Sequence, residues 1–320
     1  MSNPIQPHDS WKILDSTKIT SFMTCPRKFF FEYILGWRSE MPNNHLHFGT
    51  CFHLGMEHIL KNGLTTEAAE QATIIFLDAY RKETPPDQDE VYHPKTPTMA
   101  YSAYMEYVRV YRNDRFELLL SEIAGALTID AGVDIYFRMD AILRNEAGRI
   151  VGMDHKTSST APGYFRKLWH DDFDLSFQMH TYQALLNACY GQDENEGVIV
   201  NGVFLLKKSA IDFERINFRK SPDMLNAWAW EASLMVAMIR ANIERAMNCS
   251  DDDTVFRAFP RNTQSCTKYG GCQFKGFCLG WANPLRRVEE PPVGWKVEFW
   301  DPTKEQHKVE LNAKHKEELV

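Results

Sequence analysis

The chain has 320 residues, of which 44% are hydrophobic and 25% are charged, a balance that is typical of globular proteins and excludes disordered and fibrous ones. The formal net charge of -7 argues against a protein that coats nucleic acid by bulk electrostatics, although a groove needs only a local basic lining. The sequence has no apolar run of roughly eighteen residues and no signal-peptide layout, so we expect a cytoplasmic protein without a membrane segment.

The first third of the chain predicts helices. Polar residues suited to cap a helix are followed by apolar residues at intervals of three and four from about 17 to 35. The same spacing recurs in three further segments, and Gly63 and a proline-bearing loop separate them. We expect these helices over residues 47–64, 66–83 and 98–113.

From Phe116 the pattern changes to apolar and β-branched runs, which predict strands, with a turn at 145–148. Helical spacing returns over residues 175–191, and a long amphipathic helix begins near a proline at 222. The expected strands are 116–129, 133–145, 149–159, 197–209 and 210–220. The predicted fold class is therefore α/β, with a small mixed sheet flanked by helices.

Five segments are expected along the chain. They are an N-terminal helical segment, a second helical region, an α/β core, a cysteine-rich region, and a polar tail with a Trp and Phe cluster that packs on the body. Their expected bounds are 1–47, 48–114, 115–250, 251–283 and 284–320.

Two aspartates and a lysine suggest a metal site. Asp154 and Lys156 project to one face of a predicted strand and His155 to the other. Taken alone, an Asp-x-Lys pair is most often a surface salt bridge. Asp140, however, precedes the turn and can meet Asp154 at the same edge of the sheet. Converging carboxylates repel unless a cation lies between them, and oxygen ligands favour Mg²⁺ or Mn²⁺.

Two helical pairs flank these strands. His53 and Glu57, and likewise Gln178 and Tyr182, stand four residues apart and share a helix face. Each pair alone is more typical of a polar stripe or of ordinary packing.

The ordered series resembles the RecB-type branch of the PD-(D/E)XK nucleases over about residues 17–280, and so implies a restriction-endonuclease-like core. The resemblance implies that His53, Asp140 and Asp154 are metal ligands, together with the main-chain carbonyl of His155. It implies that Lys156 is the catalytic lysine. Gln178 and Tyr182 match the motif that flanks the site and the DNA path. Glu57 matches a helix carboxylate whose role varies. The FRMD sequence before Asp140 departs from the glycine-bearing turn of many relatives.

Four of the seven cysteines form a possible ligand set. Four thiolates can hold an Fe-S cluster or zinc, but structural zinc sites usually have shorter gaps than the five residues found here twice, which favours a cluster and leaves zinc or no metal open. The set is Cys25, Cys266, Cys272 and Cys278. The other three are expected to be core residues.

The iron-sulfur members of the resembled branch, including the AddB nuclease domain and the CRISPR-associated RecB-like exonucleases, share one distant N-terminal cysteine and three C-terminal ones. The resemblance therefore implies a 4Fe-4S cluster, although those relatives often have a two-residue gap between the second and third cysteines. Such a cluster would join the opening helix to the end of the core.

Basic and aromatic residues interleave in three stretches, which suits a path for a single strand. The alternative is that the basic side chains cover core aromatics. The candidate DNA-binding residues are Arg27, Lys28, Arg166, Lys167, Lys268 and Lys275, with Tyr269 among the aromatics.

The sequence thus predicts a metal-dependent DNA exonuclease that prefers single-stranded ends. It has no G-x-x-x-x-G-K-[ST] phosphate loop, so a helicase, recombination or CRISPR protein would have to supply the ends. Two alternatives are an end-processing subunit of a CRISPR adaptation or recombination complex, and a non-catalytic DNA-binding subunit. The oligomeric state has no signature in the sequence.

Overall fold

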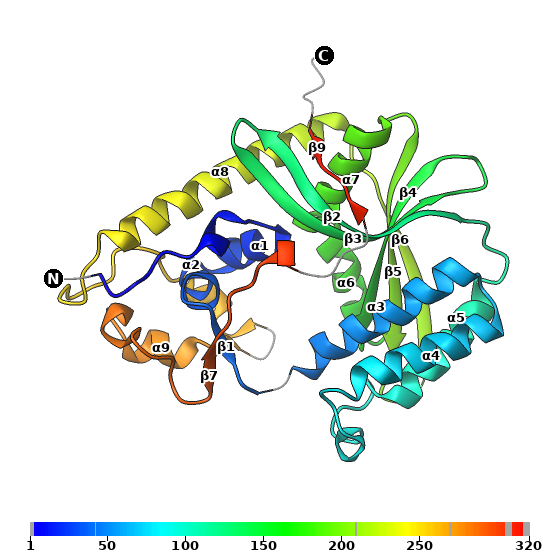
Figure 1. Ribbon diagram of the computed structural model, residues 1–320, viewed down its shortest axis with the longest axis horizontal. Coiled ribbons are helices and arrows are strands. Elements are labelled where there is room, and N and C mark those ends of the chain that lie inside the picture. Colours follow the sequence, from blue (N-terminus) through cyan, green and yellow to red (C-terminus); the bar gives the residue numbers. More distant parts are fainter. Residues whose placement is uncertain (1–2, 42, 209, 269–270, 305–308, 316–320) are drawn as a thin grey trace.

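A mixed sheet forms the centre of the protein (Figure 1). The computed structural model describes residues 3–41, 43–208, 210–268, 271–304 and 309–315. The sheet has seven strands in the order β6-β5-β4-β3-β2-β8, and β9 also pairs with β2. The strands are β2 Glu117–Asp130, β3 Val133–Arg144, β4 Ile150–Ser158, β5 Asn195–Leu205, β6 Ile211–Phe218, β8 Val309–Glu310 and β9 Ala313–Lys314.

The five strands predicted from the sequence are confirmed. In β3 buried and more exposed residues alternate, as expected for a strand with one face on the core. β2, β3 and β4 form an antiparallel meander, whereas β4 and β5 are parallel. A parallel pair needs a long crossover, and here the crossover contains α6 (Tyr164–Asp174) and α7 (Phe177–Tyr190).

Two groups of helices pack on the sheet (Figure 1). α7 contacts β3, β4 and β5, and it shares a core with α1 (Ser16–Thr24) and α8 (Pro222–Met247). The second group has its own core and packs on β4, β5 and β6; it comprises α3 (Asn44–Asn62), α4 (Thr66–Tyr80) and α5 (Pro97–Val110). None of the described helices is long and apolar enough to cross a membrane.

The predicted helix over 17–35 is interrupted, because it contains Pro26. Cys25 is extended, with φ -165° and ψ 111°, and it separates α1 from α2 (Pro26–Phe29) and the π-helical turn η2 (Phe30–Ile34). Proline has no N–H and disfavours the helical region for the residue before it. The break turns the chain toward the C-terminal region, where the N–H of Arg27 donates to the carbonyl of Pro260 at 3.2 Å.

Two parts of the structure were not expected as regular elements. The segment of α6 was predicted only as a basic and aromatic stretch, although its apolar residues gather on one side of the helix. The tail adds β7 (Trp295–Val297) to β1 (Trp37–Ser39), and β8 and β9 to the edge strand β2. The tail fits because Gly125 has no side chain: a Cβ there would overlap the backbone of Leu311. The expected packing of the tail on the body is thus confirmed.

Short helical segments complete the chain. They are η1 Asp9–Lys12, η3 Pro86–Gln88, η4 Thr263–Ser265, α9 Lys275–Gly280, η6 Pro284–Arg287 and η7 Pro302–Lys304.

Candidate active site

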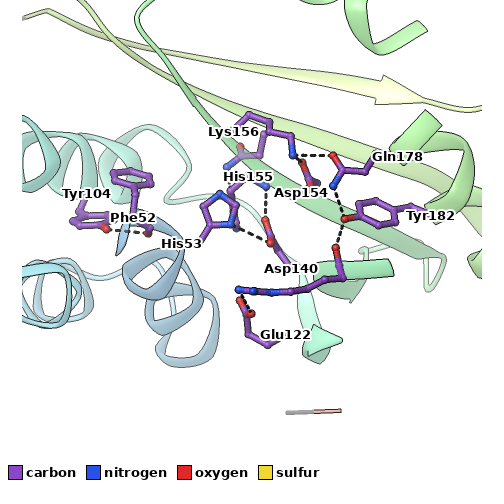
Figure 2. Close-up of polar contacts among 12 residues, drawn as sticks. Phe52, His53, Tyr104, Glu122, Asp140, Asp154, His155, Lys156, Gln178 and Tyr182 are labelled. Atoms are coloured by element: carbon purple, nitrogen blue, oxygen red, sulfur yellow. Dashed lines mark hydrogen bonds and ion pairs between the residues drawn. The ribbon is translucent and has the colours of Figure 1, made fainter. Parts of the chain in front are cut away.

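The two aspartates lie where β3 and β4 separate. The pairing of these strands ends at Ala141 and Met153, so the next residues, Asp140 and Asp154, stand at a fork in the sheet. Oδ2 of Asp140 accepts the N–H of His155 at 2.7 Å, a bond that takes the place of a ladder bond. Both aspartates line one cavity of about 480 Å³, so the expectation that they meet at one edge is confirmed (Figure 2).

His53 approaches the fork from α3. Its Nδ1 lies 3.1 Å from Oδ1 of Asp140 (Figure 2). Burial works to lower the pKa of His53, but the charge of Asp140 and the hydrogen bond to it outweigh burial, and the pKa is raised. Conversely, His53 holds the pKa of Asp140 below its usual value although burial opposes this.

Lys156 is held by a chain of polar contacts (Figure 2). Its Nζ lies 2.7 Å from Oδ2 of Asp154 and donates to Oε1 of Gln178 at 3.0 Å. Nε2 of Gln178 donates in turn to the hydroxyl of Tyr182 at 2.8 Å, and that hydroxyl donates to the main-chain carbonyl of Arg138. Tyr182 is only 1% exposed, so its position favours holding Gln178 and Lys156 over touching a substrate.

The two carboxylates offer oxygen atoms of the kind that divalent cations prefer. Oδ2 of Asp154 is buried and accepts no hydrogen bond of good geometry, although the Lys156 ammonium is close. The contact between Lys156 and Asp154 is therefore an ion pair without a directional hydrogen bond, and Oδ2 of Asp154 keeps a lone pair for a cation. Within the described ranges no three His, Cys, Asp or Glu side chains are grouped closely enough to hold a metal ion. The donor chemistry fits Mg²⁺ or Mn²⁺, but His53 and Lys156 now contact the two carboxylates.

The side chain of His155 points away from the aspartates. Its Nδ1 accepts from Nδ2 of Asn201 at 2.7 Å, and burial lowers its pKa to about 3, so the ring is neutral. The predicted alternation of faces along β4 is therefore confirmed. Only the main-chain groups of His155 are directed to the fork.

Two glutamates take different positions. Glu57 does not line the cavity and joins α3 to β2, because it accepts from Ser121 Oγ at 2.9 Å and pairs with Lys61 at 2.5 Å. Glu122, which was not selected in the sequence analysis, lies on β2 and pairs with Arg138 at 3.2 Å. Burial, and then the charge of Asp140, raises the pKa of Glu122. Its φ of 48° is unusual for a residue with a side chain, and such strain is often found beside functional sites.

The cavity has further walls that sequence reasoning did not identify. Asp15, at the start of α1, accepts from the N–H of Lys18 at 2.8 Å and from Nε1 of Trp300 at 2.7 Å. Trp300 and Pro302 therefore bring the tail to the cavity, and Lys95 reaches it from the loop before α5. These residues lie in loops without periodic patterns, so the sequence carried no local signal for them.

The four selected cysteines lie in one region. Sγ of Cys25 accepts the N–H of Asn262 at 3.3 Å, and the N–H of Cys272 donates to the carbonyl of Cys266 at 3.1 Å. Burial raises the pKa of Cys278 to about 11, Arg27 opposes this, and the charges of Cys25 and Cys272 add to it. Among the described side chains no three of these thiols are grouped as a metal site.

The four thiols are free, Cys25 accepts an N–H···S bond, and the guanidinium of Arg27 lies near Cys278. The other cysteines lie in or against the two helix-packed cores, as expected; they are Cys51, Cys189 and Cys249.

Two of the basic residues proposed to bind DNA are used inside the protein. Arg166 is 8% exposed, lies 3.1 Å from Asp212 and 3.2 Å from Glu214, and stacks on the Phe204 ring. Arg27 is 4% exposed and donates to the carbonyl of Phe259 at 2.9 Å. Arg27 and Arg166 thus cover aromatic rings of the core, which is the alternative stated above. Their assignment to DNA binding is corrected.

The remaining basic candidates stay accessible. Lys28 is partly exposed and lies 3.8 Å from Glu32, whereas the other three are exposed: Lys167, Lys268 and Lys275. Tyr269 lies outside the described residues.

Comparison with known proteins gives one family. The model of the PD-(D/E)XK nuclease superfamily matches residues 16–279. Among solved structures, a protein from Eubacterium rectale named as a candidate exonuclease is similar at 15% identity and a TM-score of 0.38, over 76% of this chain and 87% of that one. The protein SSO0001 is similar at 16% identity and a TM-score of 0.28, over 68% and 74%. No curated protein matches significantly.

Proposed function

The chain belongs to the PD-(D/E)XK nuclease superfamily, and on this premise we propose that it is a divalent-metal-dependent DNA exonuclease acting at single-stranded ends. Membership implies a metal-dependent nuclease with DNA as substrate. The direction toward an exonuclease, the single-strand preference and the choice of Mg²⁺ or Mn²⁺ are our proposal.

One observation carries the proposal: Asp140, Asp154, Lys156 and His53 line a single cavity at the fork of β3 and β4. In our assignment His53, the two carboxylates and the carbonyl of His155 would hold the metal ion. When bound, the ion would polarise a phosphate oxygen and lower the pKa of a water molecule.

The role of Lys156 follows from its neighbours. Burial works to lower its pKa, but Asp154 outweighs burial and the pKa is raised, so the side chain carries its proton at neutral pH. Gln178 fixes the direction of the ammonium group. Lys156 can therefore donate a hydrogen bond to the phosphate or to the attacking water, and it stabilises the negative charge that develops there.

Two features support action at ends. The sequence has no phosphate loop for a motor. The cavity is also walled on several sides, by α1, α3, α7 and the tail segment with Trp300, which favours a strand that enters from its terminus. The accessible lysines 28, 167, 268 and 275 remain candidates for the path of that strand.

The test compares linear and circular single-stranded DNA of equal length in one Mn²⁺ buffer. We expect the linear strand to shorten progressively and the circle to be cut far more slowly. Equal rates on both substrates would instead indicate an endonuclease with an open cleft.

A second part of the proposal concerns the cysteines. We propose that Cys25, Cys266, Cys272 and Cys278 hold a 4Fe-4S cluster, which would place the chain in the iron-sulfur group of the RecB-type branch. The support is the donor set and the meeting of segments 25–27 and 260–262, which are far apart in sequence (Figure 1). The role would be structural, because the cluster would join these segments covalently.

A further inference from the structure

A buried lysine in the same cavity has no carboxylate partner among the residues that the structure describes. Lys95 lines the cavity and is only 6% exposed. In the part of the chain that the structure describes, no carboxylate pairs with it. Its Nζ lies 3.5 Å from Oγ1 of Thr157 and 5.9 Å from the centre of the Phe48 ring. Burying an ammonium group without a carboxylate is costly, so this position suggests a ligand that supplies the missing negative charge.

The lysine is held in place before any ligand arrives. Its main-chain carbonyl accepts from Nδ2 of Asn44 at 3.3 Å and from the hydroxyl of Tyr80 at 3.4 Å. These donors belong to α3 and α4, and the Tyr80 hydroxyl also bonds to Oδ1 of Asn44 at 2.6 Å. The loop that carries Lys95 is therefore fixed to two helices, and little freedom is lost when its ammonium group binds an anion.

The position of Lys95 relative to the fork suggests which anion. Thr157 follows the catalytic Lys156 on β4, and Gly49 precedes His53 by about one turn of α3. A Cβ at Gly49 would meet only Oγ1 of Thr157, at 3.7 Å, so there is open space at this end of the cavity. Thr157 lies two residues beyond His155 on β4, and Gly49 lies four residues before His53 on α3. Both offsets are roughly 6 Å along the element, comparable to the step between neighbouring phosphates of an extended strand.

We propose that Lys95 and the hydroxyl of Thr157 bind a phosphate of the DNA strand next to the phosphate that is cleaved. This inference rests on the proposed function, because it assigns a substrate contact to the same site. The ammonium group would bind the phosphate as a point charge, the hydroxyl would donate a hydrogen bond, and the absence of a side chain at Gly49 would leave room for the strand.

The test measures binding of a short single-stranded DNA in Ca²⁺ by wild-type protein, Lys95→Met and Lys82→Met. Methionine has a similar length and no charge, and Lys82 is an exposed lysine of the same helical region outside the cavity. We expect Lys95→Met to bind about fivefold more weakly at 0.1 M salt, with a salt slope shallower by about 0.7, as the loss of one phosphate contact requires. Lys82→Met should behave as wild type.

A second set of DNA strands, each with one phosphate replaced by a neutral methylphosphonate, then locates the phosphate that Lys95 binds. In wild type one position of the substitution should weaken binding, and in Lys95→Met the same position should have no further effect. The thermal midpoint of Lys95→Met should be equal to or above that of wild type, because an unpaired buried charge has been removed; a purely structural role for Lys95 predicts a lower one.

The outcomes separate the two proposals. If wild-type protein cleaves DNA in Mn²⁺ but Lys95→Met keeps the wild-type salt slope and the same sensitivity to every neutral linkage, the inference is overturned and the proposed function stands. If wild-type protein neither cleaves nor binds DNA, the proposed function fails and the phosphate site fails with it.

Discussion

Tyr182 lines the cavity and meets its polar residues through the hydroxyl group. Its hydroxyl lies between Gln178 and the carbonyl of Arg138, and Gln178 in turn contacts Lys156. The buried ring contributes to the core below the fork. We therefore propose that Tyr182 is a positioning residue for Lys156, beside its predicted match to the motif that flanks the DNA path.

This assignment predicts the effect of Tyr182→Phe. The ring stays in the core while Gln178 loses its anchor, so kcat should fall roughly tenfold, as for other partners of metal-site residues. KM should change little, because a side chain that is 1% exposed does not contact the strand. Steady-state kinetics on linear single strands in Mn²⁺ provide the measurement. Tyr190→Phe, at the other end of α7, is the control, and a rise in KM alone would indicate DNA contact instead.

A second prediction concerns Lys95 and the free energy of unfolding. Burial lowers its pKa from 10.5 to about 8, a difference that corresponds to about 3 kcal/mol. Below pH 8 both the folded and unfolded states bind the proton and the cost is complete. Between pH 8 and 10.5 the unfolded state binds more protons, so stability rises with pH in wild type. Lys95→Met lacks this rise.

The measurement is urea unfolding of both proteins between pH 7 and 10.5. The advantage of Lys95→Met should shrink by about 3 kcal/mol from pH 8 upward. The pKa of Lys18 is also about 8, but it contributes equally to both proteins. The pKa of neighbouring His45 is lowered by burial and then by Lys95, so its own titration falls below this window. A difference that stays constant over the range would contradict the prediction.

The residues that could be predicted from the sequence are those fixed by strand periodicity. Asp140 and Asp154 could be placed together because a hairpin with a short turn determines which residues meet. Lys95 and Glu122 could not, since Lys95 lies in a loop and the positive φ of Glu122 has no signal in the strand pattern. Arg166 was misassigned because its neighbours in sequence are aromatic and basic, whereas Asp212 and Glu214, 46 and 48 residues away, balance its charge.

At the level of elements, the break after α1 determines where Cys25 lies. A continuous helix would have kept this thiol on the helix surface, whereas the extended Cys25 accepts the N–H of Asn262. The signal was present in the sequence as Pro26, and the apolar spacing on both sides of it concealed the interruption. α6 is a different case: its apolar residues do recur at helical spacing, but the segment was interpreted only as a basic and aromatic stretch.

The cluster proposal predicts the properties of two cysteine variants. Anaerobically purified protein should be brown, absorb near ~400 nm and lose the colour on reduction, as expected for cysteine-ligated Fe-S sites. Cys272→Ala should lose the colour and lower the thermal midpoint, because the cluster would connect distant segments. Cys189→Ala, which packs against the core from α7, should keep the colour.

Iron and zinc analysis of the same preparations completes this experiment. Four cysteines bound to iron should give iron in stoichiometric amounts with little zinc. Stoichiometric zinc without iron in anaerobic preparations would contradict the cluster and leave a structural zinc site as the explanation.

At the scale of the whole molecule, the cavity is assembled from both ends of the chain. Asp15 and Trp300 are bonded to each other across the cavity wall, and the strands of the tail lie on β2, next to β3 with Asp140. The sequence predicted the order of helices and strands and the packing of the tail. It could not predict that the tail would wall the cavity, because such long-range contacts leave no local pattern.

We propose that the fork of β3 and β4 is a metal-dependent nuclease site. The most direct measurement is digestion of end-labelled linear single-stranded DNA by wild-type protein and Asp154→Asn, with Mn²⁺ or with EDTA. Wild-type protein should shorten the strand only in Mn²⁺, and Asp154→Asn, with a circular dichroism spectrum like that of wild type, should leave it intact because a metal ligand is lost. Cleavage by wild type in EDTA, or wild-type activity in the variant, would contradict the account.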